Sequence, residues 1–138
     1  MKNGSLIFFL IGLFLACGDS KIEVQSPLLV VDTYPSSGAE VDPSLSDILV
    51  FFSSRIDSAS LSNDSFVLEL IGEIDTTVAG AKVSTEVLDI SEDGTSVHIV
   101  IKETPLKRGS IYRLTISNVK SVFGDKLSQS YYKFFKVR

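Results

Sequence analysis

The chain is poor in cysteine. Its 138 residues include a single cysteine, Cys17, so no disulfide can form within the chain. A secreted domain of about 100 residues can fold without a disulfide, because its hydrophobic core is large enough. The lack of cysteine pairs therefore excludes a disulfide scaffold and leaves a domain that is held together by its core.

Histidine is equally scarce, because His98 is the only one. Alternation in the segment 96–101 places Val97, Ile99 and Ile101 on one face and His98 on the other, where we expect it to face solvent. A zinc site needs several nitrogen or sulfur ligands, and a Ser-His-Asp triad needs the histidine in a pocket beside a serine. We therefore predict no enzyme, no cofactor and no zinc site.

No apolar run is long enough to span a bilayer. The longest, Leu6–Ala16, has eleven residues and would cover about 16 Å as a helix, roughly half of the hydrocarbon core. Lys2 precedes it, which gives the positive start and short apolar centre of a secretory signal peptide. We predict that residues 1–16 form a signal peptide helix that is not part of the fold.

The end of this run resembles a bacterial lipobox. Phe14-Leu15-Ala16-Cys17 has the small residue and the cysteine of that motif, with Phe14 and Leu15 where leucine and a small residue are common. The resemblance implies signal cleavage between Ala16 and Cys17 and attachment of acyl chains such as palmitate to Cys17. Several acyl chains anchor a protein to a membrane lastingly. The alternative is an ordinary signal peptide with an unmodified cysteine. Residues 17–27 contain glycine, serine and charges, and we expect a flexible tether there.

Charge is unevenly distributed. Residues 17–100 carry 15 acidic and 3 basic residues, whereas residues 101–138 carry 2 acidic and 9 basic ones. Either the two halves neutralise each other across paired strands, or the basic half forms an exposed patch for an anionic partner. Nothing else in the sequence indicates nucleic-acid binding.

Acidic residues crowd one turn, where Asp89, Glu92 and Asp93 are weak candidates for a calcium site. Calcium prefers clustered carboxylate and carbonyl oxygens, but these residues form no recognised calcium loop. The alternative is a solvated acidic surface, which is common in loops.

From residue 28 onward, short apolar or alternating runs are separated by turn signals. About seven strands at a spacing near ten residues, with no long helix, predict an all-β antiparallel sandwich over residues 28–138. A single helical turn is expected at 58–61 with Asp57 as its N-cap, and a hairpin turn at Asp93-Gly94. The expected strands are 28–31, 48–52, 65–70, 82–90, 96–101, 111–117 and 129–137.

The stretch 106–112 fits a tyrosine corner. Leu106 is followed by Gly109 at a turn and by Tyr112 at the start of a strand, as in immunoglobulin-like sandwiches. The corner places the ring at the edge of the core and the hydroxyl against backbone a few residues upstream. The alternative is a plain inward-facing tyrosine.

Together with the tyrosine-corner stretch, residues spread over about 32–137 resemble the bacterial Ig-like domains of the S-layer type. Ser121 and Asp125 stand where the family usually has aspartate and asparagine. The resemblance implies a structural or adhesive module without catalytic machinery, although fold alone does not prove function. The matching positions are Pro35, Gly38, Val41, Phe52-Ser53, Asp57, Ser65–Leu68, Val78–Gly80, Leu106, Gly109, Tyr112, Gly124 and Leu127.

We therefore expect a lipid-anchored protein of the cell envelope, at the outer membrane or cell surface, with another envelope protein, cell-wall glycan or a host ligand as partner. The alternative is a periplasmic accessory subunit or spacer of a larger complex. The aromatic and basic strand 129–137 is either an exposed edge that carries the contact or a core strand that completes the sheet.

Overall fold

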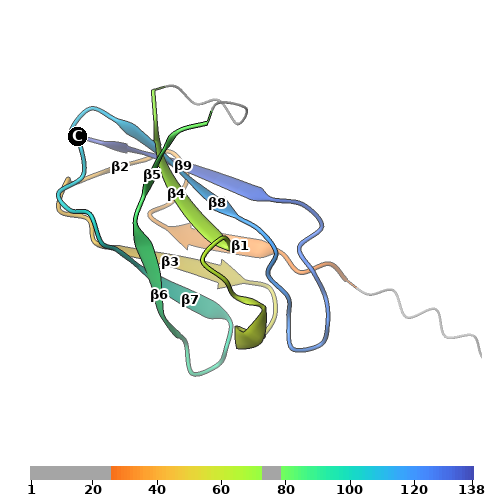
Figure 1. The fold of residues 1–138 in the computed structure, drawn as a ribbon. Helices are drawn as coiled ribbons and strands as arrows, with labels where there is room; N and C mark the ends of the chain where they lie inside the picture. Colours follow the sequence, from red (N-terminus) through yellow and green to blue (C-terminus); the bar gives the residue numbers. More distant parts are fainter. Residues whose placement is uncertain (1–25, 73–78) are drawn as a thin grey trace, which may run out of the picture.

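The computed structural model describes residues 26–72 and 79–138, which form two β-sheets packed face to face (Figure 1). The predicted signal peptide and Cys17 lie outside the described residues. One sheet has the strand order β1-β3-β7-β6 and the other β2-β9-β8-β4-β5. The elements are β1 (Val30–Tyr34), β2 (Ala39–Val41), β3 (Asp47–Phe52), the 3-10 helix η1 (Ser58–Ser60), β4 (Phe66–Ile71), β5 (Ala81–Val83), β6 (Thr85–Ile90), β7 (Ser96–Ile101), β8 (Ile111–Ile116) and β9 (Tyr131–Val137).

The core follows the alternation of the strands. In β7, Val97 and Ile99 are fully buried, and in β8 Leu114 and Ile116 are buried from the opposite sheet. Alternate side chains of a strand point to opposite faces, so each sheet presents one apolar face to the other. The predicted all-β sandwich and the inward faces of these strands are confirmed.

The number of strands is nine rather than seven, partly because the segment predicted as one strand over 82–90 is divided. β5 pairs with β4 in one sheet, whereas β6 pairs with β7 in the other. Ser84 stands at the crossing, where its carbonyl accepts a hydrogen bond from the Lys102 N–H at 2.8 Å. Half-buried side chains still alternate through the crossing, at Val83, Thr85 and Val87, so the pattern could not reveal the change of sheet.

The second added strand is β2, which is short and pairs with β9 in parallel. This pairing is the one departure from antiparallel order among the described strands. β9 therefore lies between β2 and β8 inside its sheet. The interpretation of 129–137 as an exposed edge is therefore wrong for residues 135–137, which pair on both sides, whereas residues 131–133 pair with β8 alone.

Local signals placed the turns correctly. The Asp57 side chain accepts a hydrogen bond from the Ala59 N–H and caps η1. Gly94 adopts a φ of 77°, in the left-handed region that glycine reaches without strain, and closes the β6–β7 hairpin. A short polar side chain at a cap and a glycine at a turn act locally, so sequence alone predicts them.

The described chain begins and ends at opposite ends of the sandwich. The segment that leads into β1 lies at one end, and the C-terminus lies at the other (Figure 1). Within residues 26–72 and 79–138, no helix is long and apolar enough to cross a membrane.

Candidate functional site

Tyr112 ties the loop before β8 to the core. Its side chain is buried, and its ring stacks on Phe135 with a centroid distance of 5.6 Å. The hydroxyl accepts a hydrogen bond from the Lys107 N–H at 3.0 Å, and Gly109 turns the chain with a φ of 77°. Leu106 is buried in the same core. This contact of the hydroxyl with upstream backbone is the one by which a corner tyrosine holds its loop, so its role is structural.

His98 lies on the outer face of its sheet, between two carboxylates from the neighbouring strands. Its Nε2 lies 2.8 Å from Asp47 Oδ1 on β3, and its Nδ1 lies 3.6 Å from Asp89 Oδ1 on β6. It lies on the predicted outer face and is 26% exposed, so solvent reaches it while two carboxylates flank it. A bulge in β6 explains the second contact, because it brings Asp89 opposite His98 and leaves Leu88 as an exposed extra residue.

The serine of this cluster is not hydrogen-bonded to the imidazole. Ser46 donates its hydroxyl hydrogen to Asp47 Oδ2 at 2.5 Å, rather than bonding to the imidazole. A catalytic serine needs the histidine within hydrogen-bond reach, and here both ring nitrogens face carboxylates. The Ser46 hydrogen bond, followed by the His98 contact, lowers the pKa of Asp47 from its ordinary value of 3.8. The cluster joins three strands, β3, β7 and β6.

The three calcium candidates do not point to a common centre. Asp93 Oδ1 accepts hydrogen bonds from Ser91 Oγ at 2.6 Å, the Thr95 N–H at 3.1 Å and Thr95 Oγ1 at 2.9 Å. These bonds, that of Ser91 first, lower the pKa of Asp93. Asp89 faces His98, and Glu92 is exposed. Across the described part of the chain, no three carboxylate, histidine or cysteine side chains gather as metal ligands would.

A buried ion pair on the outer face of the other sheet was not found from the sequence. Arg113 on β8 lies directly opposite Glu69 on β4, and its Nη2 and Nε lie 2.5 Å and 3.2 Å from Glu69 Oε2. The two side chains are 6% and 12% exposed, and the guanidinium lies 5.9 Å from the centroid of the Tyr132 ring. Both charges stand at outward positions of alternating strands, but the pairing of β4 with β8 is not visible in the sequence.

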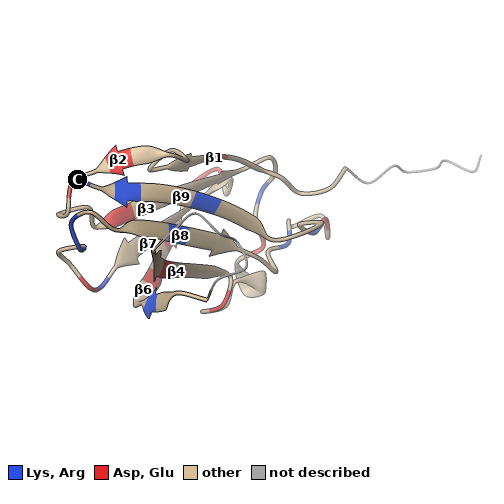
Figure 2. Ribbon diagram, turned by 90° about the horizontal axis from the view of Figure 1, so that it is seen from above, with Lys and Arg blue, Asp and Glu red and all other residues tan. Residues whose placement is uncertain are grey.

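This pair bears on the uneven charge of the chain. Arg113–Glu69 and Lys102–Glu86 each join a base from the C-terminal part to an acid from the N-terminal part. Figure 2 shows basic residues on β9 and an acidic residue on its neighbour β2, where Glu40 stands opposite Lys136. The structure therefore favours neutralisation across strands over one large basic patch.

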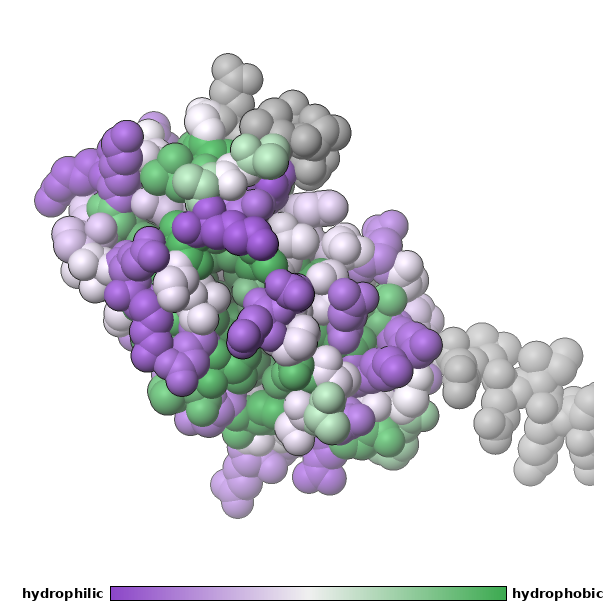
Figure 3. All heavy atoms as spheres, viewed as in Figure 1, coloured by the Kyte–Doolittle hydropathy of each residue, from purple (hydrophilic) through white to green (hydrophobic). Residues whose placement is uncertain are grey.

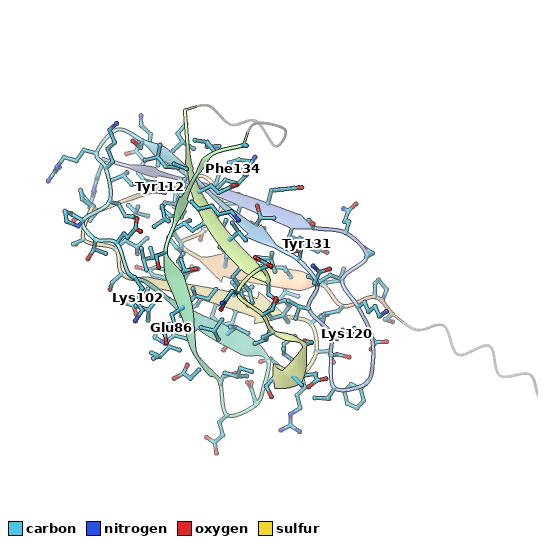
Figure 4. The ribbon with its side chains drawn as sticks, viewed as in Figure 1. Glu86, Lys102, Tyr112, Lys120, Tyr131 and Phe134 are labelled. Atoms are coloured by element: carbon cyan, nitrogen blue, oxygen red, sulfur yellow. The ribbon has the colours of Figure 1, made fainter. Side chains whose placement is uncertain are left out.

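Apolar side chains remain exposed in the loop between β8 and β9. We call residues 121–125 the β8–β9 tip; within it Val122 is 49% exposed and Phe123 is 72% exposed. The loop lies at the end where the described chain starts, as the position of Lys120 in Figure 4 shows. Sequence reasoning did not single out this loop, since one Val-Phe step has no periodicity to analyse.

Comparison with known proteins was made at the level of sequence and of structure. A sequence model of the family described as bacterial Ig-like domain matches residues 24–136. No curated protein sequence matches the chain.

Solved structures with the same fold include surface layer proteins and copper resistance proteins. Domains 1–6 of the surface layer protein SbsC match with a TM-score of 0.59 and 19% identity over 80% of this chain, which spans only 13% of that chain. The copper resistance protein PcoC from Escherichia coli matches with a TM-score of 0.62 and 16% identity, over 80% of this chain and 99% of that one. CopC from Methylosinus trichosporium OB3b matches with a TM-score of 0.52 and 17% identity, over 80% of this chain and 92% of that one. At these identities the likeness shows the fold alone.

Proposed function

Because the chain belongs to the bacterial Ig-like domain family, we propose that it is a lipid-anchored, non-enzymatic protein of the cell envelope. Its single sandwich acts in binding, adhesion or envelope structure. Its partner is another envelope protein, a cell-wall glycan or a host ligand, and its site is the outer membrane or the cell surface. The fold is shared with S-layer domains and with copper-resistance proteins, which supports an envelope location.

The observation that carries this proposal is how soon the fold begins after Cys17. Leu28 is already 1% exposed, bridges Leu127 and donates its N–H to the Lys126 carbonyl at 3.2 Å. Only ten residues separate it from the cysteine that ends the apolar run. A removable signal that leads through a short tether into one sandwich is the organisation of an anchored module.

The absence of catalysis in this proposal rests on the chemistry of His98. Its Nε2 is hydrogen-bonded to Asp47, its Nδ1 lies 3.6 Å from Asp89, and the cluster's Ser46 bonds to a carboxylate rather than to the ring, so the cluster lacks the serine–histidine contact of a hydrolase. The sandwich can instead bind a partner through its loops or through its edge strands, which are β1, β6, β2 and β5.

Copper handling is not part of the proposal. A copper site uses histidine, methionine or cysteine ligands, and one of the similar structures is titled a methionine-rich copper resistance protein. This chain has one methionine, Met1, which lies in the predicted signal peptide, and one histidine, which is held between carboxylates. Among the described residues, His98 is therefore the only side chain of these three ligand types.

Replacement of the lipidation residue tests the anchoring. We expect Cys17→Ser to move the full-length protein from the membrane fraction to the soluble fraction and to abolish labelling by a fatty-acid probe. Ser20→Ala is the matched control, because it alters the same segment and keeps the thiol. Membrane partition and labelling that stay the same in Cys17→Ser would refute lipid anchoring.

Protease treatment of intact cells tests on which side of the outer membrane the sandwich lies. Digestion of the sandwich supports a surface role in binding or adhesion. Protection in intact cells, with digestion after the outer membrane is opened, supports instead a periplasmic accessory subunit or spacer.

A further inference from the structure

The β8–β9 tip is a hydrogen-bonded turn from which two apolar side chains, Val122 and Phe123, point outward. Ser121 is only 2% exposed, and its hydroxyl accepts hydrogen bonds from the Phe123 N–H at 3.1 Å and the Asp125 N–H at 3.2 Å. The Gly124 N–H donates to the Ser121 carbonyl at 3.0 Å, and Gly124 has a φ of 89°. With its backbone fixed in this way, the turn keeps Phe123 away from the core.

The rest of the loop is fastened to the sandwich. The Val122 N–H donates to the Arg55 carbonyl at 2.9 Å, and the Ser121 N–H donates to the Asp125 carbonyl at 2.8 Å. A fixed backbone presents Phe123 without a further loss of loop entropy on binding, which is what a contact surface needs.

The tip lies beside the start of the described chain. Ser26 and Pro27 line one hollow together with Gly124, Asp125 and Lys126. Nine residue steps separate Ser26 from Cys17, which reach at most roughly 30 Å when fully extended. Anchoring at Cys17 would therefore hold the start of the sandwich, with the tip beside it, within about 30 Å of the bilayer. The C-terminus lies at the opposite end (Figure 1).

Basic side chains flank the tip. Lys120 and Lys126 face each other in a β-bridge at its base, and both are exposed. Aromatic and aliphatic tips with lysines behind them suit the interface of a bilayer, where the rings enter the boundary of the acyl chains and the ammonium groups meet headgroup phosphates. Figure 3 shows apolar residues reaching the surface at the end from which the N-terminal trace leaves.

We propose that the β8–β9 tip is a second membrane contact, in which Val122 and Phe123 insert into the surface of the bilayer that holds the lipid on Cys17. The inference rests on the proposed anchoring. The tip and the anchor together fix the orientation of the sandwich, with the tyrosine corner and the C-terminus directed away from the membrane. The competing explanation is that Val122 and Phe123 bind a protein partner. The position of the tip beside the start of the described chain favours the bilayer instead.

A single-tryptophan probe tests the contact, because the chain contains no tryptophan. The full-length lipidated Phe123→Trp variant is reconstituted into vesicles of phosphatidylethanolamine and phosphatidylglycerol whose acyl chains carry bromine. Tyr34→Trp is the matched control, because Tyr34 is also exposed, at 55%, and lies near Arg138. Insertion to about 5–10 Å below the headgroups should blue-shift the emission of Phe123→Trp and quench it severalfold more than that of Tyr34→Trp.

The outcomes separate this inference from the proposed function. The mass of the purified protein reports whether Cys17 carries acyl chains, and bromine quenching reports the tip. An acylated protein with equal quenching at both positions overturns the docking and leaves the anchor standing. An unacylated Cys17 overturns the proposed lipid anchor. It also overturns the proposed membrane contact of the tip, because that contact rests on the anchor. Crosslinking of position 123 to an envelope protein, without bromine quenching, assigns the tip to a protein partner and also overturns the docking.

Discussion

The Arg113–Glu69 pair and the His98 cluster lie on the outer faces of different sheets, and they differ in burial. On the five-stranded sheet, Arg113 and Glu69 are 6% and 12% exposed. On the four-stranded sheet, His98 is 26% exposed and its partners Asp47 and Asp89 are 51% and 64% exposed. In both clusters a nitrogen donor on one strand faces a carboxylate on a neighbouring strand, and the two clusters differ in how far solvent reaches them.

Burial changes what the loss of one partner costs. An exposed ion pair contributes about 0–1 kcal/mol, because water solvates both groups when the pair breaks. Removal of one partner of a buried pair costs about 3–5 kcal/mol, because the remaining charge has lost its water and its partner. The two sheets should therefore respond differently to equivalent substitutions.

The largest expected effect is at Arg113. We expect Arg113→Met to lower the free energy of unfolding by about 3–5 kcal/mol, since it leaves the Glu69 carboxylate buried without its guanidinium. Urea or thermal unfolding measures the change. The matched control is the double variant Arg113→Met with Glu69→Leu, which removes both charges and should recover most of the loss. A double variant as unstable as the single one would show that packing, rather than the unpaired charge, sets the cost.

A smaller effect is expected at His98. We expect His98→Gln to lower the free energy of unfolding by no more than about 1 kcal/mol, because solvent reaches all three side chains of the cluster. The same unfolding experiment measures it. Between the two carboxylates, Asp47→Asn should cost more than Asp89→Asn, because its oxygen lies 2.8 Å rather than 3.6 Å from the ring. A loss at His98 equal to that at Arg113 would contradict the role given to burial.

The smallest expected effect is on the dependence of stability on pH. The pKa of Asp47 is lowered from 3.8, so the folded state favours its ionised form. The stabilisation is therefore present above about pH 4 and is lost as the pH falls through the lowered value. We expect Asp47→Asn to reduce the loss of melting temperature on acidification below pH 4.

Ser46→Ala is the companion to this prediction. It removes the hydrogen bond that contributes most to the shift and keeps the carboxylate, so it should reduce the same acid loss. An acid profile that both variants leave unchanged would mean that Asp47 has no part in it.

Much of the fold could be predicted because it depends on neighbours along the chain. The alternation that buries Val97 and Ile99 and the cap at Asp57 are confirmed. The hydroxyl of Tyr112 reaches Lys107, only five residues upstream. Such interactions are local, so residue type and spacing carry them.

The candidate sites were harder to predict, because they join distant residues. His98 meets Asp47 across 51 positions, and Arg113 meets Glu69 across 44. Neither pairing has a signal in one sequence, since it depends on which strands become neighbours. The exposure of Phe123 has the same origin, because it depends on a turn that other segments hold in place.

By itself, the sequence determined the all-β class, the inward faces of the main strands and the positions of the local turns. It predicts the signal peptide and the lipid on Cys17, which the experiments above test. Only the tertiary structure decided that β5 and β6 belong to different sheets, that β9 is an inner strand and that a bulge brings Asp89 to His98. The physical reason is the two-residue period of a strand, which tells which side of the sheet a residue faces but not which strand lies beside it.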